Sequence, residues 1–270
     1  MKKQMAERKL AVVTGASSGI GAMFARKLAA RGYDLLLVAR REDRLRSLAV
    51  ELSEMYHVDS DVMVADLAAD ADRERVAERI RSASNLGLLV NNAGFGTLGF
   101  FADSDLESQL QMHRLHVLAA MHLTHAALTN LIPRGEGGVI NVSSVAAFGQ
   151  SAGSVSYCAT KGWMNDFTSA LHAELEVQKS PVKVQALCPG FTLSEFHDTA
   201  AIDRSPIPQS LWMTADFVVS ESLRGFDEGK LIVIPGWRYK LIVMFMKALP
   251  GWALRKMSAK GAERYRKQKV

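Results

Sequence analysis

The sequence predicts a single α/β domain built on a doubly wound parallel sheet, and three observations support this prediction. Short apolar runs recur along the first 235 residues and alternate with longer segments of helical periodicity. The apolar runs are continuous, as is typical of parallel strands buried on both faces. The chain has 270 residues, 48% of them hydrophobic and 23% charged, which suits one large domain with a substantial core.

The first strand is predicted at Leu10–Val13, and residues 14–21, which follow it, read TGASSGIG. Ile20, Phe24 and Leu28 then recur every four residues and predict a helix with one core-facing stripe. Glycines at such a junction let the backbone approach a pyrophosphate, and the helix N-terminus offers free N–H groups. We therefore expect a dinucleotide phosphate here; the alternative is an ordinary turn rich in Gly and Ser.

The second strand, Asp34–Ala39, ends at Arg40 and Arg41. In a dinucleotide-binding fold this corner meets the adenosine ribose, where an acidic residue binds the 2′-hydroxyl and an arginine accommodates a 2′-phosphate. Arg40 occupies the corner and the first acidic residue is Glu42, so the sequence favours NADP(H) over NAD(H). The alternative is that both arginines only solvate the start of the next helix.

The remaining elements follow the same alternation. Further strands are predicted at Asp61–Ala65, Gly87–Val90, Gly138–Val142, Val182–Leu187 and Lys230–Ile234. Helical periodicity is found around Leu45, Leu48 and Leu52 and over residues 70–84, 103–131, 155–177 and 215–223. Residues 103–131 predict a long helix or a helix with a break. Residues 191–213 lack periodicity and follow the sixth strand, where a substrate lid would lie.

Two further patterns bear on metals and compartment. His113 and His116 lie three residues apart but lack a carboxylate companion, so we expect no metal site. Cys158 and Cys188 show no pairing or metal-ligand spacing and are predicted to be reduced core thiols. The basic N-terminus is not followed by the apolar region of a secretory signal, and we expect a cytoplasmic protein.

A candidate catalytic set lies between Asn141 and Lys161. Tyr157 and Lys161 are four residues apart, so on a helix both project from one face. An ammonium near a phenol favours the phenolate, so we expect Lys161 to lower the pKa of Tyr157 and make it a general acid or base. Ser144 would hydrogen-bond the oxygen that the phenol protonates. The alternative is a buried Tyr, a surface Lys and a turn-forming Ser.

Taken in order, these motifs resemble the short-chain dehydrogenase/reductase family over roughly residues 8–235. The resemblance implies a Rossmann-like fold, catalysis by Ser144, Tyr157 and Lys161, and NADP(H) as cofactor. It also implies a structural turn at NNAG, residues 91–94, and nicotinamide contacts near Thr192 and Ser194. The cofactor-binding residues it implies are Gly15, Ser17, Ser18, Gly19, Ile20, Gly21, Arg40, Asp66, Leu67, Asn92, Ala93, Gly94, Tyr157, Lys161, Pro189, Gly190 and Thr192.

The sequence departs from the family pattern at one catalytic position. The family carries an Asn on the long helix, which helps to hold a water that links the Lys to solvent, and His116 stands at that place. A histidine can also hold a water by hydrogen bonds, but its protonation is sensitive to pH. This departure concerns the proton relay rather than the hydride chemistry.

The chain divides into an N-terminal extension at 1–8, the reductase domain at 9–236 and a C-terminal tail at 237–270. The tail holds ten Lys or Arg and a single Glu, whereas residues 1–236 are net acidic. No basic folded face or nucleic-acid motif is found, so we expect no nucleic-acid partner. The tail joins apolar runs to these charges, which predicts either peripheral membrane contact or packing on the domain or a partner subunit.

We therefore expect an NADP(H)-dependent oxidoreductase that interconverts a carbonyl and an alcohol, on a lipophilic small molecule, as a homodimer or homotetramer. The alternative is a non-catalytic NADP(H)-binding sensor or scaffold on the same fold.

Overall fold

The computed structural model describes residues 8–195, 207–256 and 258–259. Seven strands form one parallel sheet in the order β3-β2-β1-β4-β5-β6-β9. These strands are β1 Leu10–Thr14, β2 Asp34–Ala39, β3 Ser60–Val64, β4 Leu86–Asn91, β5 Gly138–Val142, β6 Lys183–Leu187 and β9 Ile232–Val233. The long helices are α1 Gly19–Ala30, α2 Glu42–Tyr56, α3 Asp70–Arg81, α4 Leu106–His113, α5 Ala120–Arg134, α6 Val155–Val177, α8 Ala215–Asp227 and α9 Trp237–Ala248.

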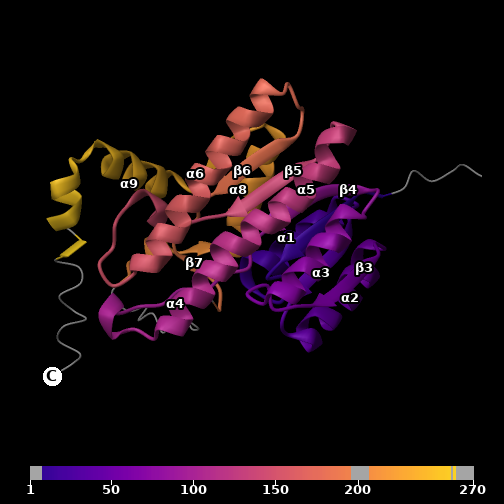
Figure 1. Ribbon diagram of the computed structural model, residues 1–270, viewed down its shortest axis with the longest axis horizontal. Coiled ribbons are helices and arrows are strands. Elements are labelled where there is room, and N and C mark those ends of the chain that lie inside the picture. Colours follow the sequence, from indigo (N-terminus) through magenta and orange to yellow (C-terminus); the bar gives the residue numbers. More distant parts are fainter. Residues whose placement is uncertain (1–7, 196–206, 257, 260–270) are drawn as a thin grey trace, which may run out of the picture.

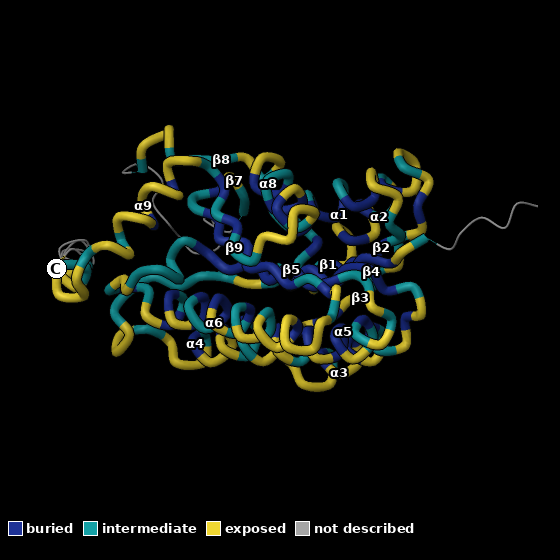
Figure 2. Tube along the Cα trace, turned by 90° about the horizontal axis from the view of Figure 1, so that it is seen from above, coloured by how far each residue is buried: buried dark blue, intermediate teal, exposed yellow. Residues whose placement is uncertain are grey.

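Helices cover both faces of the sheet (Figure 2). α3, α4, α5 and α6 lie on one face, and α1, α2 and α8 lie on the other. Each face buries its own apolar cluster, one around Phe24 and Leu45 and the other around Ile80 and Leu123. The doubly wound, Rossmann-like single domain predicted from the sequence is thus confirmed.

The strand order reverses between β1 and β4, where β2 leaves to one side and β5 to the other. A crevice opens at the carboxyl ends of the strands at such a point, and ligands bind there. This topology therefore directs the ends of β1, β4 and β5, with the turns that follow them, into one place.

The predicted elements differ from the observed ones mainly at their ends. The last strand is only the two-residue Ile232–Val233, because Gly and Lys residues precede it and α9 follows soon after. The predicted long helix spans Leu106–Arg134 and is interrupted by a π-helical turn, η2, at Arg114–Ala119. By length and composition alone this helix would suffice to cross a membrane, but it packs against α3 and the sheet and half of its apolar window is buried.

A buried polar network joins β4 and β5. Asn91 and Asn141 are register partners in the two strands, and the Asn91 amide donates to the Asn141 side-chain oxygen at 2.9 Å. The Asn91 amide also donates to Thr124 on α5, and the Asn141 amide donates to Thr168 on α6, each at 2.9 Å. The network therefore ties two adjacent strands to the helices that cover them.

The segment predicted as an irregular substrate loop is partly ordered by short elements. β7, Thr192–Leu193, pairs in parallel with β8, Met213–Thr214, and between them η4 spans Gln209–Leu211. Residues 196–206 of the predicted loop lie outside the described residues. The two described ends of this segment are thus held side by side at the carboxyl end of β6.

The C-terminal residues form more than a tail. Residues 237–248 form α9, which lies at one end of the molecule beyond α6 (Figure 1). Tyr239 is 4% exposed and packs against Gly190, where any β-carbon would lie only 2.0 Å from the Tyr239 ring. The Tyr239 hydroxyl accepts from the Phe191 N–H at 2.9 Å and donates to the Leu211 carbonyl at 2.8 Å. α9 is therefore anchored on the substrate segment.

Candidate active site

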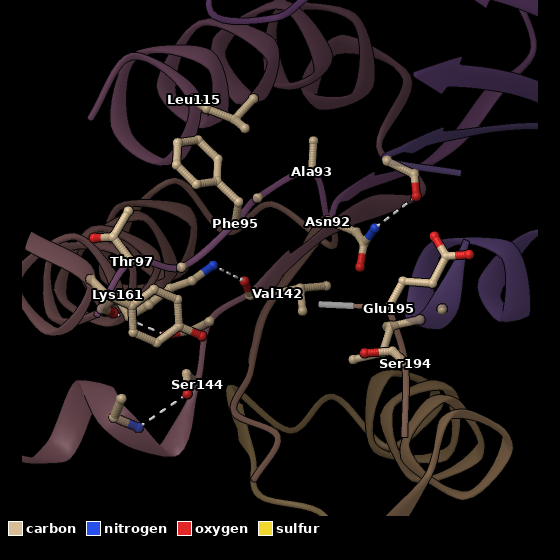
Figure 3. A pocket seen from close by; sticks show the side chains of 18 of the residues that line it. Asn92, Ala93, Phe95, Thr97, Leu115, Val142, Ser144, Lys161, Ser194 and Glu195 are labelled. Carbon is tan, nitrogen blue, oxygen red and sulfur yellow. Dashed lines mark hydrogen bonds between the residues drawn. The ribbon is translucent and has the colours of Figure 1, made fainter. Parts of the chain in front are cut away.

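A cleft of about 1390 Å³ lies at the carboxyl ends of the strands. Figure 3 shows Lys161 and Ser144 on one side of it, Ser194 and Glu195 on the other, and Asn92 between them. Among the residues predicted for the site, only Gly21 and His116 do not line the cleft. The structure therefore brings most of the predicted set, which is spread over nearly 180 residues of sequence, to one surface.

The turn after β1 has the shape that a close backbone approach requires. Gly15 has φ +64°, and a β-carbon there would lie 2.7 Å from the Asn92 amide nitrogen. Gly19 has φ +55°, a conformation that residues with side chains rarely adopt. Gly21 acts differently, because a β-carbon there would collide with the Gly15 carbonyl; it lets α1 pack closely and does not face the cleft.

Thr14 and Asn92 hold this turn against the end of β4. The Thr14 hydroxyl accepts hydrogen bonds from the backbone N–H groups of Asn92 and Ala93, at 2.9 and 3.0 Å. The Asn92 side chain donates to the Thr14 carbonyl at 2.9 Å. The NNAG turn therefore braces neighbouring strands, Asn91 toward β5 and Asn92 toward β1.

At the adenosine end of the cleft, the two arginines after β2 differ. Arg41 donates to the hydroxyls of Ser17 and Ser18, each at 2.9 Å, and pairs with Glu195 at 2.8 Å. Arg40 also lines the cleft, but within the described residues no hydrogen bond or ion pair engages its exposed side chain. The structure thus directs Arg41, rather than the predicted Arg40, toward the glycine turn.

Glu195 links this corner to the segment after β6. It pairs with Arg41 and also with Arg44 on α2. Hydrogen bonds from these two guanidinium groups lower the pKa of the Glu195 carboxyl to about 2, so it is ionised at physiological pH. Asp66 and Leu67 line the same end of the cleft, and the Asp66 carboxylate accepts from the Ala68 N–H at 3.1 Å.

The catalytic candidates meet where β5 ends and α6 begins. Ser144 is 8% exposed, its hydroxyl accepts from the Ala146 N–H at 3.1 Å, and it is hydrogen-bonded to Tyr157. Lys161 is 4% exposed, and its ammonium donates to the Val142 carbonyl at 2.8 Å. The same ammonium lies 5.8 Å from the centre of the Tyr157 ring.

The expectation that Lys161 lowers the pKa of Tyr157 is wrong for the protein alone. Burial raises the pKa of Tyr157 to about 12, and the hydrogen bond with Ser144 only partly opposes this. Burial also lowers the pKa of Lys161 to about 8, because its charge is costly away from water. Tyr157 therefore holds its proton at neutral pH and is ready to act as an acid.

His116 lies behind the cleft wall, on the π-helical turn, and is fully buried. Its Nε2 accepts from the Phe95 N–H at 3.2 Å, which leaves Nδ1 protonated and donating to the Thr160 hydroxyl at 3.0 Å. Burial, with the charge of Lys161, holds the pKa of His116 well below its usual range, so the ring is neutral. Both nitrogens therefore have protein partners in this structure, and the suggestion that His116 takes the place of the family Asn in the proton relay stays a prediction.

The turn after β6 forms the wall opposite the catalytic set. Pro189, Gly190 and Thr192 line the cleft, and the buried Thr192 hydroxyl donates to the Gly190 carbonyl at 3.0 Å. The Ser194 hydroxyl donates to the Thr192 carbonyl at 3.3 Å, and a β-carbon on Gly19 would lie 2.9 Å from that of Ser194. The segment after β6 therefore closes against the glycine turn.

Sequence reasoning missed two groups of lining residues. Residues 95–100 after NNAG supply apolar side chains, and Met246 reaches the cleft from α9. The NNAG motif was the sequence signal for the first group, because residues 95–100 follow it directly and therefore begin at the same strand end. Packing of the C-terminal segment on the domain was one of the predicted alternatives, but the sequence did not indicate that it reaches the cleft.

Comparisons with known proteins agree with this geometry. The sequence model of the family described as short chain dehydrogenase matches residues 9–204. The chain is 32% identical to a short-chain dehydrogenase from Sphingobium yanoikuyae solved in complex with NADPH, with a TM-score of 0.80, covering 97% of this chain and 96% of that one.

Two curated relatives differ in what their names say of activity. The very-long-chain 3-oxoacyl-CoA reductase of Anas platyrhynchos is 32% identical over 192 residues, 68% of this chain and 60% of that protein. The inactive hydroxysteroid dehydrogenase-like protein 1 of Homo sapiens is 23% identical over 251 residues, 90% of this chain and 72% of that protein. With a family match over most of its length and the matching fold, this chain belongs to the short-chain dehydrogenase/reductase family of oxidoreductases.

Proposed function

We propose that the protein is an NADP(H)-dependent enzyme that interconverts a carbonyl and an alcohol on a lipophilic substrate, with Tyr157 as general acid and base. The observation that carries this proposal is the convergence of Ser144, Tyr157 and Lys161 at the wall of a cleft that also contains the glycine turn.

The residues present fit a dinucleotide phosphate. Gly15 and Gly19 leave space that β-carbons would fill, and the N-terminus of α1 opens at the same place. Arg41, Ser17 and Ser18 form a cluster of donors at the adenosine end, which supports the choice of NADP(H). The NADPH complex of the Sphingobium relative supports the same choice.

The residues of this chain would then divide the work of carbonyl reduction. The nicotinamide, when bound, supplies the hydride. Ser144 orients the substrate oxygen, and Tyr157 donates its hydroxyl proton to that oxygen. Lys161 lies close enough to stabilise the phenolate that remains, because opposite charges attract strongly in a buried site. In alcohol oxidation the same proton returns to Tyr157.

The substrate class follows from the lining beyond Tyr157. Phe95, Leu98, Phe100, Phe191 and Met246 line the cleft together with Tyr157, and these apolar side chains favour an apolar substrate. The name of the Anas relative, a reductase of very-long-chain 3-oxoacyl-CoA, supports a carbonyl on a long apolar chain.

A second proposal, a non-catalytic NADP(H)-binding sensor or scaffold, is favoured by one observation. The human relative named above is described as inactive, so the fold is retained in proteins described as lacking this activity.

Oxidation of NADPH by the purified chain, with a panel of aldehydes and ketones, separates these proposals. We expect turnover on an apolar carbonyl, and a loss of about 100-fold or more in Tyr157→Phe because the transferable proton is gone. NADPH binding should survive in that variant. Tyr56→Phe, on α2, is the matched control and should keep full turnover. Near-normal reduction by Tyr157→Phe, or binding without turnover on any carbonyl, would contradict the catalytic proposal.

A further inference from the structure

The outward face of α9 is apolar, although it faces away from the body of the protein. Tyr239 and Val243 point inward and are 4% and 3% exposed. Trp237, Leu241 and Phe245 follow one another at intervals of four residues and are 63%, 49% and 57% exposed. Helical residues at this spacing share one face. α9 is therefore apolar on two faces, whereas a surface helix of a soluble domain normally turns a polar face outward.

An exposed apolar side chain is also found past the end of α9. Residues 251–256 are helical, and Trp252 is 64% exposed. Figure 1 shows this part at the end of the molecule, beyond α9, and Figure 2 shows both segments largely exposed. An exposed tryptophan thus stands at the start of α9 and another in the short helix beyond it, and tryptophan is typical of a membrane interface.

Cations surround this surface and no acidic residue lies within it. Arg238, Lys240, Lys247, Arg255 and Lys256 are all exposed, and residues 237–256 contain no Asp or Glu. Anionic headgroups attract such clusters. The combination of exposed aromatics with basic residues alone is complementary to an anionic lipid surface. A short helix of this kind lies in the interface rather than crossing the bilayer, which takes about 20 residues.

α9 also lies at an opening toward the catalytic cleft. A second cavity of about 600 Å³ lies beside the helix, where Leu241 and Phe245 of the outward face line it together with Leu254, Ala146 and Cys158. Met246 lines this cavity and the catalytic cleft together. Ala146, Ser151 and Cys158 line both spaces as well, so the two spaces adjoin along this wall, with the flexible, unbranched Met246 side chain on the α9 side.

We propose that the outward face of α9 and residues 251–256 dock on an anionic lipid bilayer, and that the cavity beside α9, which Leu241 and Phe245 of this face also line, is the entrance through which an apolar substrate passes from the bilayer to the cleft. The docking stands on the surface alone, while the entrance rests on the carbonyl chemistry proposed above. Tyr239 fixes α9 to both described ends of the substrate segment, so a docked α9 would hold that segment at the membrane.

Co-sedimentation of the full chain with vesicles tests the docking. Vesicles of phosphatidylcholine with about one third phosphatidylglycerol should carry the protein down at low salt, and 0.5 M salt or pure phosphatidylcholine should release it. Leu241→Gln with Phe245→Gln should weaken binding at least tenfold, because two inserted apolar side chains are lost. Lys240→Gln with Arg255→Gln should weaken it by about fivefold for each charge removed.

The matched control is Val50→Gln with Met55→Gln on α2, where the side chains are equally exposed, at 57% and 61%. This control should bind vesicles within about twofold of the unmodified chain, as its helix carries no comparable ring of cations. Full-length protein that stays in the supernatant with anionic vesicles at low salt would overturn the proposal. The proposal would also be overturned if the Leu241→Gln and Phe245→Gln double variant dissociated an oligomer of the chain without changing vesicle binding. The outward face of α9 would then join two copies of the chain.

A kinetic comparison tests the entrance. On a long-chain ketone dissolved in vesicles, the same pair should raise KM several-fold, while KM for a short water-soluble carbonyl stays unchanged. An equal change for both substrates would overturn the entrance. Sedimentation needs no activity, and the soluble carbonyl needs no membrane. Sedimentation therefore tests the docking proposal and turnover of the soluble carbonyl tests the proposed catalytic function, so a failure of one can be distinguished from a failure of the other.

Discussion

Replacement of Arg41 by Ala is expected to remove most of the preference for NADPH, and replacement of Arg40 is not. Arg41 is directed at Ser17 and Ser18 in the glycine turn, so its guanidinium stands where a 2′-phosphate would find a charged donor. A hydrogen bond to a charged group contributes about 1.5–3 kcal/mol. The Arg41 side chain is 40% exposed, so the lower half of that range applies. This corresponds to about 12- to 45-fold in the dissociation constant of NADPH.

Because Arg41 is paired with Glu195, a substitution of Glu195 should change the affinity for NADPH in the opposite direction. The Glu195 carboxylate occupies donors that a phosphate would need, so Glu195→Gln should tighten NADPH binding. An exposed ion pair contributes about 0–1 kcal/mol, which limits this gain to about fivefold. The affinity for NADH, which lacks the 2′-phosphate, should change little in either variant.

Isothermal titration of the three variants with NADPH and NADH measures these effects. Arg40→Ala is the control, because that side chain is exposed and is not directed at the serines; a change within about twofold is expected. A loss in Arg40→Ala that equals the loss in Arg41→Ala would refute the assignment. Weaker NADPH binding by Glu195→Gln would show that Glu195 positions Arg41 instead of competing for it.

Two further predictions concern the catalytic wall. The kcat/KM for carbonyl reduction should stay level from pH 6 to near 8 and fall above it. The reason is that Tyr157 keeps its proton up to about pH 12, whereas Lys161 loses its charge near pH 8. A pH–rate profile with its inflection near 6.5 would point to a titrating histidine instead. His116→Leu should lower the free energy of unfolding by about 1–3 kcal/mol, because the Phe95 N–H and the Thr160 hydroxyl lose their partner, and His116→Asn, which keeps an acceptor, should lose less. Urea unfolding measures both, and equal losses in the two variants would argue against the hydrogen-bonding role.

The fold could be predicted from the sequence because its strands and helices are encoded by patterns of neighbouring residues. Asp34–Ala39 and Gly138–Val142 are short, mainly apolar runs, and Val155–Val177 shows a sustained helical period, so these elements were predicted with their observed bounds. Arg40 and Arg41 could not be separated in this way. Both line the cleft, and which of them reaches Ser17 and Ser18 depends on where α2 begins; Arg41 is the residue just before that helix.

The remaining differences arise from burial and from tertiary contacts, which adjacent residues do not encode. The spacing of Tyr157 and Lys161 correctly placed the two side chains together, but the protein packed around the phenol determines the direction of its pKa. The occupied ring of His116 depends on Phe95 and Thr160, 21 and 44 residues away along the chain. The return of Met246 to the cleft depends on how Tyr239 packs on Gly190.

The paired asparagines of β4 and β5 have a consequence for how the protein assembles. If β5 slid by one residue along β4, Asn141 would lose both Asn91 and Thr168, and Asn91 would lose one of its acceptors. Each orphaned polar group costs about 1–3 kcal/mol, a large part of a typical stability of 5–15 kcal/mol. A sheet with β5 in a shifted register would therefore be much less stable than the native sheet. Asn91 and Asn141 therefore favour the native register of β4 and β5, the two strands whose carboxyl ends carry Asn92 and Ser144.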